Sequence, residues 1–142
     1  MAKKPNAKRD LAGITCVQIP LFGGRLMLTL DREQHDRAMA WLGQPKSPDS
    51  DFNCLGFCQD YDDKEDRQCI VVHIIDWRLD TLVHELAHAT FKILDRRGVE
   101  TGDGDRETFC YLIDHLFAQT FTPTTQRWQE EQDKKEAKND PA

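Results

Sequence analysis

The chain has 142 residues with 39% hydrophobic content, which fits one compact domain with a modest core. Its formal net charge of −6 argues against a protein whose main role is binding nucleic-acid phosphates. The N-terminus lacks the apolar core of a signal peptide, and no apolar run approaches the roughly 20 residues that span a bilayer, so we expect a cytoplasmic protein without a membrane role.

The first part of the chain predicts a leader, a hairpin and a helix. Residues 1–12 are basic and are expected to be a flexible leader. Strand-like runs over 14–19 and 25–30 flank a turn with two glycines and predict a β-hairpin. An aspartate with a glutamine three residues later is typical of a helix N-terminus and predicts an amphipathic helix over 31–43.

The middle of the chain predicts a second hairpin. The segments 52–59 and 68–77 are strand-like, and the acidic stretch DYDDKEDR between them is typical of a solvated turn. Together the two hairpins predict a small antiparallel sheet.

Two further helices complete the predicted domain, which spans residues 13–122. The first is expected from about Asp80 to Arg96, and the second from Asp103 or Asp105 to about Gln119. Residues 123–142 are charged and poor in core residues, which predicts a mobile tail. The fold class expected is therefore α+β, with three helices mainly on one face of the sheet.

A stretch near the start of the first of these helices, TLVHELAHATF, contains His84, Glu85 and His88. Residues four apart on a helix share a face, with Cβ atoms about 5–6 Å apart, so both histidines can reach one metal ion. Glu85 is rotated about 100° from His84 and can instead reach a metal-bound water. This H-E-x-x-H pattern predicts that two histidines hold zinc while the glutamate takes a proton from the water.

The segment HELAHATFKILDRRGVETGDGDRETFCYLIDHLF resembles the gluzincin branch of zinc metallopeptidases and small zincin-like proteins encoded in bacteriophage genomes. The resemblance implies a minimal zincin fold with one Zn²⁺ per chain. It also implies Glu107, nineteen residues after His88, as third ligand beside His84 and His88, with Glu85 as general base. A peptide substrate would add as a strand beside an edge strand, for which we expect the run CIVVHII.

The chain departs from the gluzincin pattern at Tyr111, where family members carry an aspartate that orients a zinc histidine. Asp114, Asp76 and Asp80 are the open alternatives for that role. Tyr111 itself is a candidate to stabilise a tetrahedral oxyanion, or else packs at the helix interface.

Other residues of metal-binding type have simpler explanations than a role in the site. The remaining candidates for third ligand are better explained as helix caps or lie more than two turns beyond Glu107: Asp103, Asp105 and His115. A thiolate site has poor spacing and no fourth ligand: Cys54, Cys58 and Cys69. Two further histidines are expected to be scaffold or surface residues: His35 and His73.

The function expected is a zinc-dependent metallopeptidase, encoded by a phage or prophage, that acts on a protein or peptide substrate in the host cytoplasm. The alternative is a non-catalytic zincin-shaped module that binds a host or virion protein, because the chain is too short for a separate substrate-binding lobe. A DNA-associated protease that uses the basic leader is a third hypothesis, although nucleic acid is not the expected partner. The oligomeric state is left open.

Overall fold

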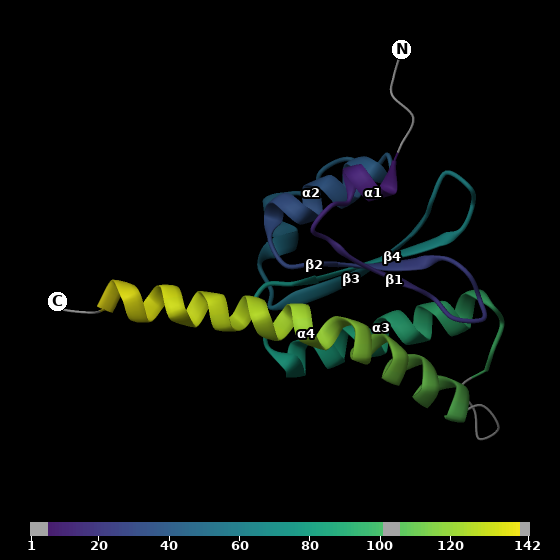
Figure 1. The fold of residues 1–142 in the computed structure, drawn as a ribbon. Coiled ribbons are helices and arrows are strands. Elements are labelled where there is room, and N and C mark those ends of the chain that lie inside the picture. The colour runs from purple at the N-terminus through teal and green to yellow at the C-terminus, as the bar shows by residue number, and fades with distance from the viewer. Residues whose placement is uncertain (1–5, 101–105, 140–142) are drawn as a thin grey trace, which may run out of the picture.

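The computed structural model describes residues 6–100 and 106–139 and shows an α+β fold, as expected. A four-stranded sheet in the order β1-β2-β4-β3 lies between two layers of helices (Figure 1). The strands are β1 (Thr15–Gln18), β2 (Arg25–Thr29), β3 (Gly56–Asp62) and β4 (Gln68–Ile74). The helices are α1 (Ala7–Asp10), α2 (Arg32–Trp41), the 3₁₀ helix η1 (Asp49–Phe52), α3 (Leu79–Arg96) and α4 (Arg106–Asn139).

The sheet is mixed, so the expectation of an antiparallel sheet was wrong at one pairing. Both predicted hairpins are present, because β1 pairs antiparallel with β2 and β3 pairs antiparallel with β4. However, β2 and β4 run parallel, with Leu26 opposite Ile70. The chain leaves β2 through α2 and η1, forms the outer strand β3, and returns between β3 and β2, which gives β4 the direction of β2.

Strand β4 is interior, so the expectation that CIVVHII forms the edge strand was also wrong. All seven residues of β4 are buried. A continuous apolar run is typical of a strand that is covered on both faces, because neither face can be left to water. The edge strands of the described sheet are β1 and β3.

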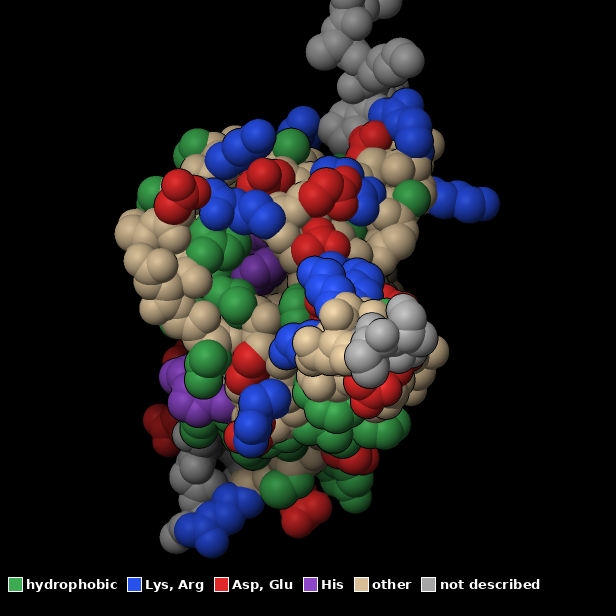
Figure 2. Space-filling model, turned by 90° about the vertical axis from the view of Figure 1, so that its left-hand side faces the viewer, with side chains coloured by type: hydrophobic (Ala, Val, Ile, Leu, Met, Phe, Trp, Pro, Cys, Tyr) green, Lys and Arg blue, Asp and Glu red, His purple; other side chains and the backbone are tan. Residues whose placement is uncertain are grey.

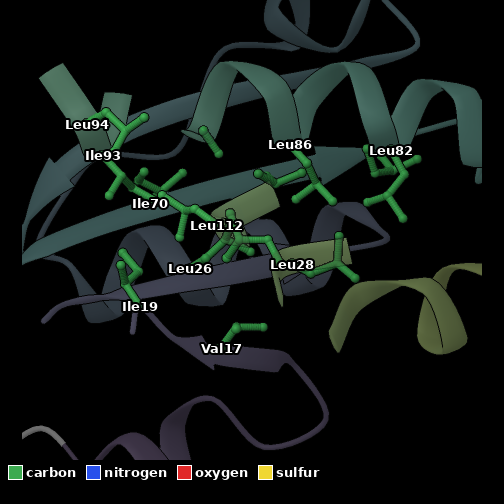
Figure 3. Packing of buried hydrophobic residues seen from close by; sticks show 14 of the residues in the cluster. Val17, Ile19, Leu26, Leu28, Ile70, Leu82, Leu86, Ile93, Leu94 and Leu112 are labelled. Atoms are coloured by element: carbon green, nitrogen blue, oxygen red, sulfur yellow. The ribbon is translucent and has the colours of Figure 1, made fainter. Parts of the chain in front are cut away.

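Helices cover both faces of the sheet, not mainly one. Leu26 and Ile70 point to the side of α3 and α4, where Leu82 and Leu86 of α3 pack against them (Figure 3). Alternate residues of the same strands belong to a second cluster with α2: Met27, Cys69, Val71, Ala38 and Leu42. Alternate side chains of β2 and β4 therefore belong to two separate hydrophobic cores, one on each face of the sheet.

Helix α3 begins and ends close to its predicted bounds. Asp76 stabilises its first turn, because one carboxylate oxygen accepts from the backbone N–H of Arg78 (3.2 Å) and the other from the Thr81 hydroxyl (2.7 Å). At the other end Gly98 has φ +66°, and the backbone N–H of Val99 donates to the carbonyl of Leu94 at 3.0 Å. A glycine in the left-handed region ends a helix without strain from a Cβ atom.

Helix α4 extends well past its predicted end near Gln119, and the tail expected from residue 123 is helical as far as Asn139. The helix passes through Pro123, and just beyond it the Thr124 hydroxyl is buried and donates to the carbonyl of Thr120 at 2.9 Å. Arg127 then pairs with Asp31 at 3.0 Å. The start of the tail is thus part of the domain, and the rest of α4 projects away from it (Figure 1).

The predicted leader is described from residue 6 onward. Its residues 6–12 include α1, and Leu11, which follows α1, is only 4% exposed in the core under α2. Within 6–100 and 106–139, no helix is long and apolar enough to cross a membrane.

Candidate metal centre

Two histidines of α3 converge on one point at the protein surface. The Nε2 atoms of His84 and His88 lie 3.2 Å apart, and their rings are inclined by 77°. Two nitrogens bound tetrahedrally to zinc at 2.0–2.1 Å would stand about 3.3–3.4 Å apart. The pair therefore has the spacing of two zinc ligands, as the sequence predicted.

The pair is exposed because the opposite side of α3 is the buried one. Leu82, Leu86 and Ala89 face the sheet with no exposed surface, which turns the two histidines outward. Histidine side chains accordingly reach the surface on the face seen in Figure 2. The helix thus holds both imidazoles where an ion from solution can reach them.

Glu85 lies beside the pair but is turned toward strand β3, and its residue is only 7% exposed. A Cβ atom placed on Gly56 would lie 3.3 Å from Cγ of Glu85 and 2.9 Å from the carbonyl oxygen of His73. A Cβ atom at this position would therefore force the backbone of β4 or the side chains of α3 to shift. No residue in the described part of the chain donates a hydrogen bond to the Glu85 carboxylate, and such a carboxylate is costly to bury unless water or a cation compensates it.

The thiol nearest this carboxylate is not prepared to bind metal. Burial raises the pKa of Cys58 to about 12, and the charges of Glu85 and Asp60 add to that shift while Lys92 opposes it. Cys58 packs at the core on the α3 side, whereas Cys69 lies in the α2-side core and Cys54 is exposed. The three cysteines that we considered as a thiolate site are therefore not brought together.

The structure does not bring Glu107 to the histidines. Glu107 is exposed in the first turn of α4, directly after residues 101–105. Among the residues described, no three His, Cys, Asp or Glu side chains form a group that could hold a metal ion. The alternative ligands Asp103 and Asp105 lie outside the described residues, as does their expected role as helix caps.

Tyr111 and His115 line a separate hollow of about 290 Å³, which α4 forms with the turn between β1 and β2. Tyr111 is 72% exposed there. The structure therefore does not place the candidate oxyanion donor at the histidine pair.

The three candidates for orienting a zinc histidine differ in what they contact. Asp76 is engaged at the start of α3, and Asp80 pairs with Arg78 at 2.9 Å. Asp114 instead borders an apolar hollow of about 290 Å³ between α3 and α4, together with Val83, the residue before His84. No hydrogen bond within the described residues joins any of the three to His84 or His88.

Two features of the structure were not anticipated from the sequence. The first is strand β3 as the edge beside Glu85, for which the glycine at its start was a possible signal. The second is the burial of His35 and His73, which are 0% and 2% exposed on the other face of the sheet. The sequence carries no local signal for that second cluster, because the two histidines and the two phenylalanines around them come from separate segments.

Comparison of the chain with protein-family models, with curated proteins and with solved structures gave no match. Function is therefore inferred from the geometry of the site.

Proposed function

We propose that the chain is a zinc-dependent metallopeptidase, with His84, His88 and Glu107 as ligands of one Zn²⁺ and Glu85 as general base. The observation that carries this proposal is the 3.2 Å approach of the two Nε2 atoms on the solvent side of α3. In the metal-free chain this distance fits a hydrogen bond from one Nε2–H to the other Nε2, and loss of that proton leaves two lone pairs at the spacing of zinc ligands. The pair thus fits two of the ligands that catalytic zinc requires.

The roles of the residues follow from their positions on α3. Zinc, when bound, polarises the scissile carbonyl and lowers the pKa of a water molecule to about 7. Glu85 accepts the proton of the attacking water and passes it to the leaving amine. Its position against β3, with no hydrogen-bond donor from a described residue, leaves the carboxylate free for that transfer.

Glu107 is the proposed third ligand because a two-histidine site offers too few protein ligands for catalytic zinc. It stands in the first turn of α4, whose start packs against the end of α3 through Phe109 and Phe91, with ring centroids 4.9 Å apart. Metal binding commonly orders the segments that supply ligands. The proposal requires the first turn of α4 to move toward the histidines when zinc binds.

The proposed substrate is an extended peptide that pairs with the outer edge of β3. This strand has only β4 as a partner within the described sheet. An added strand would gain backbone hydrogen bonds there and would run past Gly56, against which Glu85 is packed. Asp60 and Asp62 on the same strand discourage pairing with a second copy of the chain.

The test is turnover of a peptide library by zinc-loaded protein, compared with Glu85→Gln. That substitution keeps the size of the side chain and removes the base, so cleavage is expected to fall by about 10²-fold or more. Equal cleavage by both proteins would show that another residue, or a contaminating peptidase, does the chemistry.

The second candidate function is a non-catalytic zincin-shaped module that binds another protein. It is favoured by one observation, the absence of a third ligand beside the histidines among the described residues. Zinc-loaded protein that cleaves no member of the library, yet binds extended peptides along β3, would support this alternative.

A further inference from the structure

A second pair of histidines lies on the opposite face of the sheet, inside a cluster of four aromatic rings. His35 of α2 and His73 of β4 meet Phe52 of η1 and Phe57 of β3. Every two of these rings have centroids 5.1–5.4 Å apart. We call these four residues the His–Phe cluster.

Each imidazole of the cluster has a neutral hydrogen-bond partner. Nδ1 of His73 and the hydroxyl of Thr29 lie 2.7 Å apart, and Nε2 of His35 and Oε1 of Gln59 lie 3.0 Å apart. Nδ1 of His35 is buried and has no hydrogen-bond partner among the described residues. Within the described residues the hydrogen-bond partners of both rings are uncharged, so the cluster is built for two neutral histidines.

The charges around the cluster do not reverse this preference. Burial is the largest effect, and it lowers the pKa of His35 and lowers the pKa of His73 to about 4. Asp31 favours the charged form of His73, whereas His35 and Arg32 oppose it.

His35 experiences a similar balance. Burial lowers its pKa most, the hydrogen bond to Gln59 and the charges of Asp36 and Asp51 favour its charged form, and Arg32 opposes it. The guanidinium of Arg32 already lies 3.7 Å from the centre of the Phe52 ring, so the cluster borders one cation before any histidine is protonated.

The cluster fastens one stretch of the chain, residues 49–59, to the sheet. Phe57 stands opposite His73 in the β3–β4 pairing, and Phe52 packs on both histidines. Gln59 adds hydrogen bonds to His35 and to the hydroxyl of Ser47, the latter at 3.5 Å. This stretch comprises η1 and the first half of the edge strand, and it includes Gly56, where β3 meets Glu85.

We propose that the His–Phe cluster is an acid-sensitive latch: neutral histidines hold residues 49–59 against the sheet, and protonation releases them. Two imidazolium rings 5.2 Å apart would repel each other in a buried site. His73 cannot move away, because β4 is held between β2 and β3 and all of its residues are buried. Residues 49–55, which include η1, belong to no strand, so the stretch opens from that end instead and residues 56–59 follow as their pairing with β4 breaks. This latch belongs to the fold and does not depend on peptidase activity.

The direction of the pH effect follows from linkage. The released state has histidines of ordinary pKa, about 6.5, whereas the closed state binds protons less readily. Above about pH 6.5 the histidines are neutral in both states, so the closed latch has its full stability relative to the released state. This stability falls as the pH decreases toward about 4. Each histidine raises the population of the released state by up to about tenfold per pH unit in that window.

Hydrogen exchange of the full chain at pH 7, 6 and 5, corrected for intrinsic exchange rates, tests the latch. Protection of residues 49–59 should fall by about tenfold or more between pH 7 and pH 5, while protection of α3 residues 82–94 stays constant. His35→Phe/His73→Phe keeps rings in both places and should abolish the pH dependence. His115→Ala, which removes a histidine outside the cluster, should retain it.

Unchanged protection of 49–59 across this range in the parent chain would overturn the proposal, as would loss of the response in His115→Ala. If the double variant does not fold, the histidine NMR titration of the parent chain decides instead. Titration of both buried imidazoles near pH 6.5 without any change in the amides of 49–59 would overturn the latch, whereas joint changes below that pH would support it.

Discussion

The two histidine pairs of this protein lie on opposite faces of one sheet and have opposite properties. His84 and His88 are exposed one helical turn apart, with their Nε2 atoms 3.2 Å from each other. His35 and His73 come from a helix and a strand and are almost completely buried, and each has one ring nitrogen bonded to a neutral side chain.

The difference lies in surroundings rather than in residue type. The surface pair can bind an ion from solution without moving anything aside, whereas the interior pair would first have to displace Phe52 or Phe57. A pair that is free to bind a cation is suited to a metal site. Protonation of a pair that is buried among phenyl rings instead lowers the stability of the surrounding fold. Substitutions at each pair should therefore have separable effects.

The largest expected effect is loss of zinc from the surface pair. His84→Ala/His88→Ala should reduce zinc from about one ion per chain to none, as measured by elemental analysis. Because both side chains are exposed, the free energy of unfolding of metal-free protein should change by no more than about 0.5 kcal/mol. Zinc retained at the parental level would place the metal elsewhere.

The matching change at the interior pair should have the reverse outcome. His35→Ala/His73→Ala leaves cavities and unpaired partners at Thr29 and Gln59, so the free energy of unfolding should fall by about 2–5 kcal/mol in a denaturant titration. Folded molecules of this variant should still bind one zinc ion. A variant as stable as the parent would show that the cluster contributes no packing energy.

Removal of zinc sharpens the comparison further. Zinc at a hundred times its dissociation constant should stabilise the folded state by about 2.7 kcal/mol, so a chelator should lower the Tm of the parent chain. The same chelator should leave the Tm of His84→Ala/His88→Ala unchanged in a thermal scan. Equal shifts in both proteins would mean that the stabilising metal is not at the histidines.

The smallest expected effect concerns Gly56, the first residue of β3, which packs against Glu85. In Gly56→Ala the new Cβ atom would meet the carbonyl of His73 and the side chain of Glu85, at a cost of about 1–3 kcal/mol. Displacement of Glu85 should lower kcat while zinc affinity is preserved. Peptide turnover and zinc titration of the same preparation measure the two effects, and parallel losses of both would argue against a specific role for the glycine.

The sequence predicted the elements with strong local signals. The two hairpins were recognised from turn residues, and α3 from its apolar periodicity and the glycine beyond its end. The histidine spacing on α3 was readable for the same reason, because positions four apart on a helix have a fixed relation.

What the sequence could not supply were relations between distant segments. The parallel pairing of β2 with β4 depends on where the chain returns after α2, and no local pattern encodes it. The fully apolar run of β4 was nevertheless a signal for an interior strand that we interpreted as an edge. The burial of His35 depends on Phe52 and Phe57, which reach it only through the same pairing.

The central claim, a zinc site of His84, His88 and Glu107, is tested most directly by zinc titration against a competing chelator. Loss of an outer-shell partner weakens metal binding about 10–100-fold. Glu107→Ala removes a proposed ligand and should weaken zinc binding by more than that. Glu100→Ala, which removes an exposed glutamate outside the proposed site, should bind zinc like the parent chain. If Glu107→Ala binds zinc as tightly as the parent chain, Glu107 is not a ligand and the proposed site is contradicted.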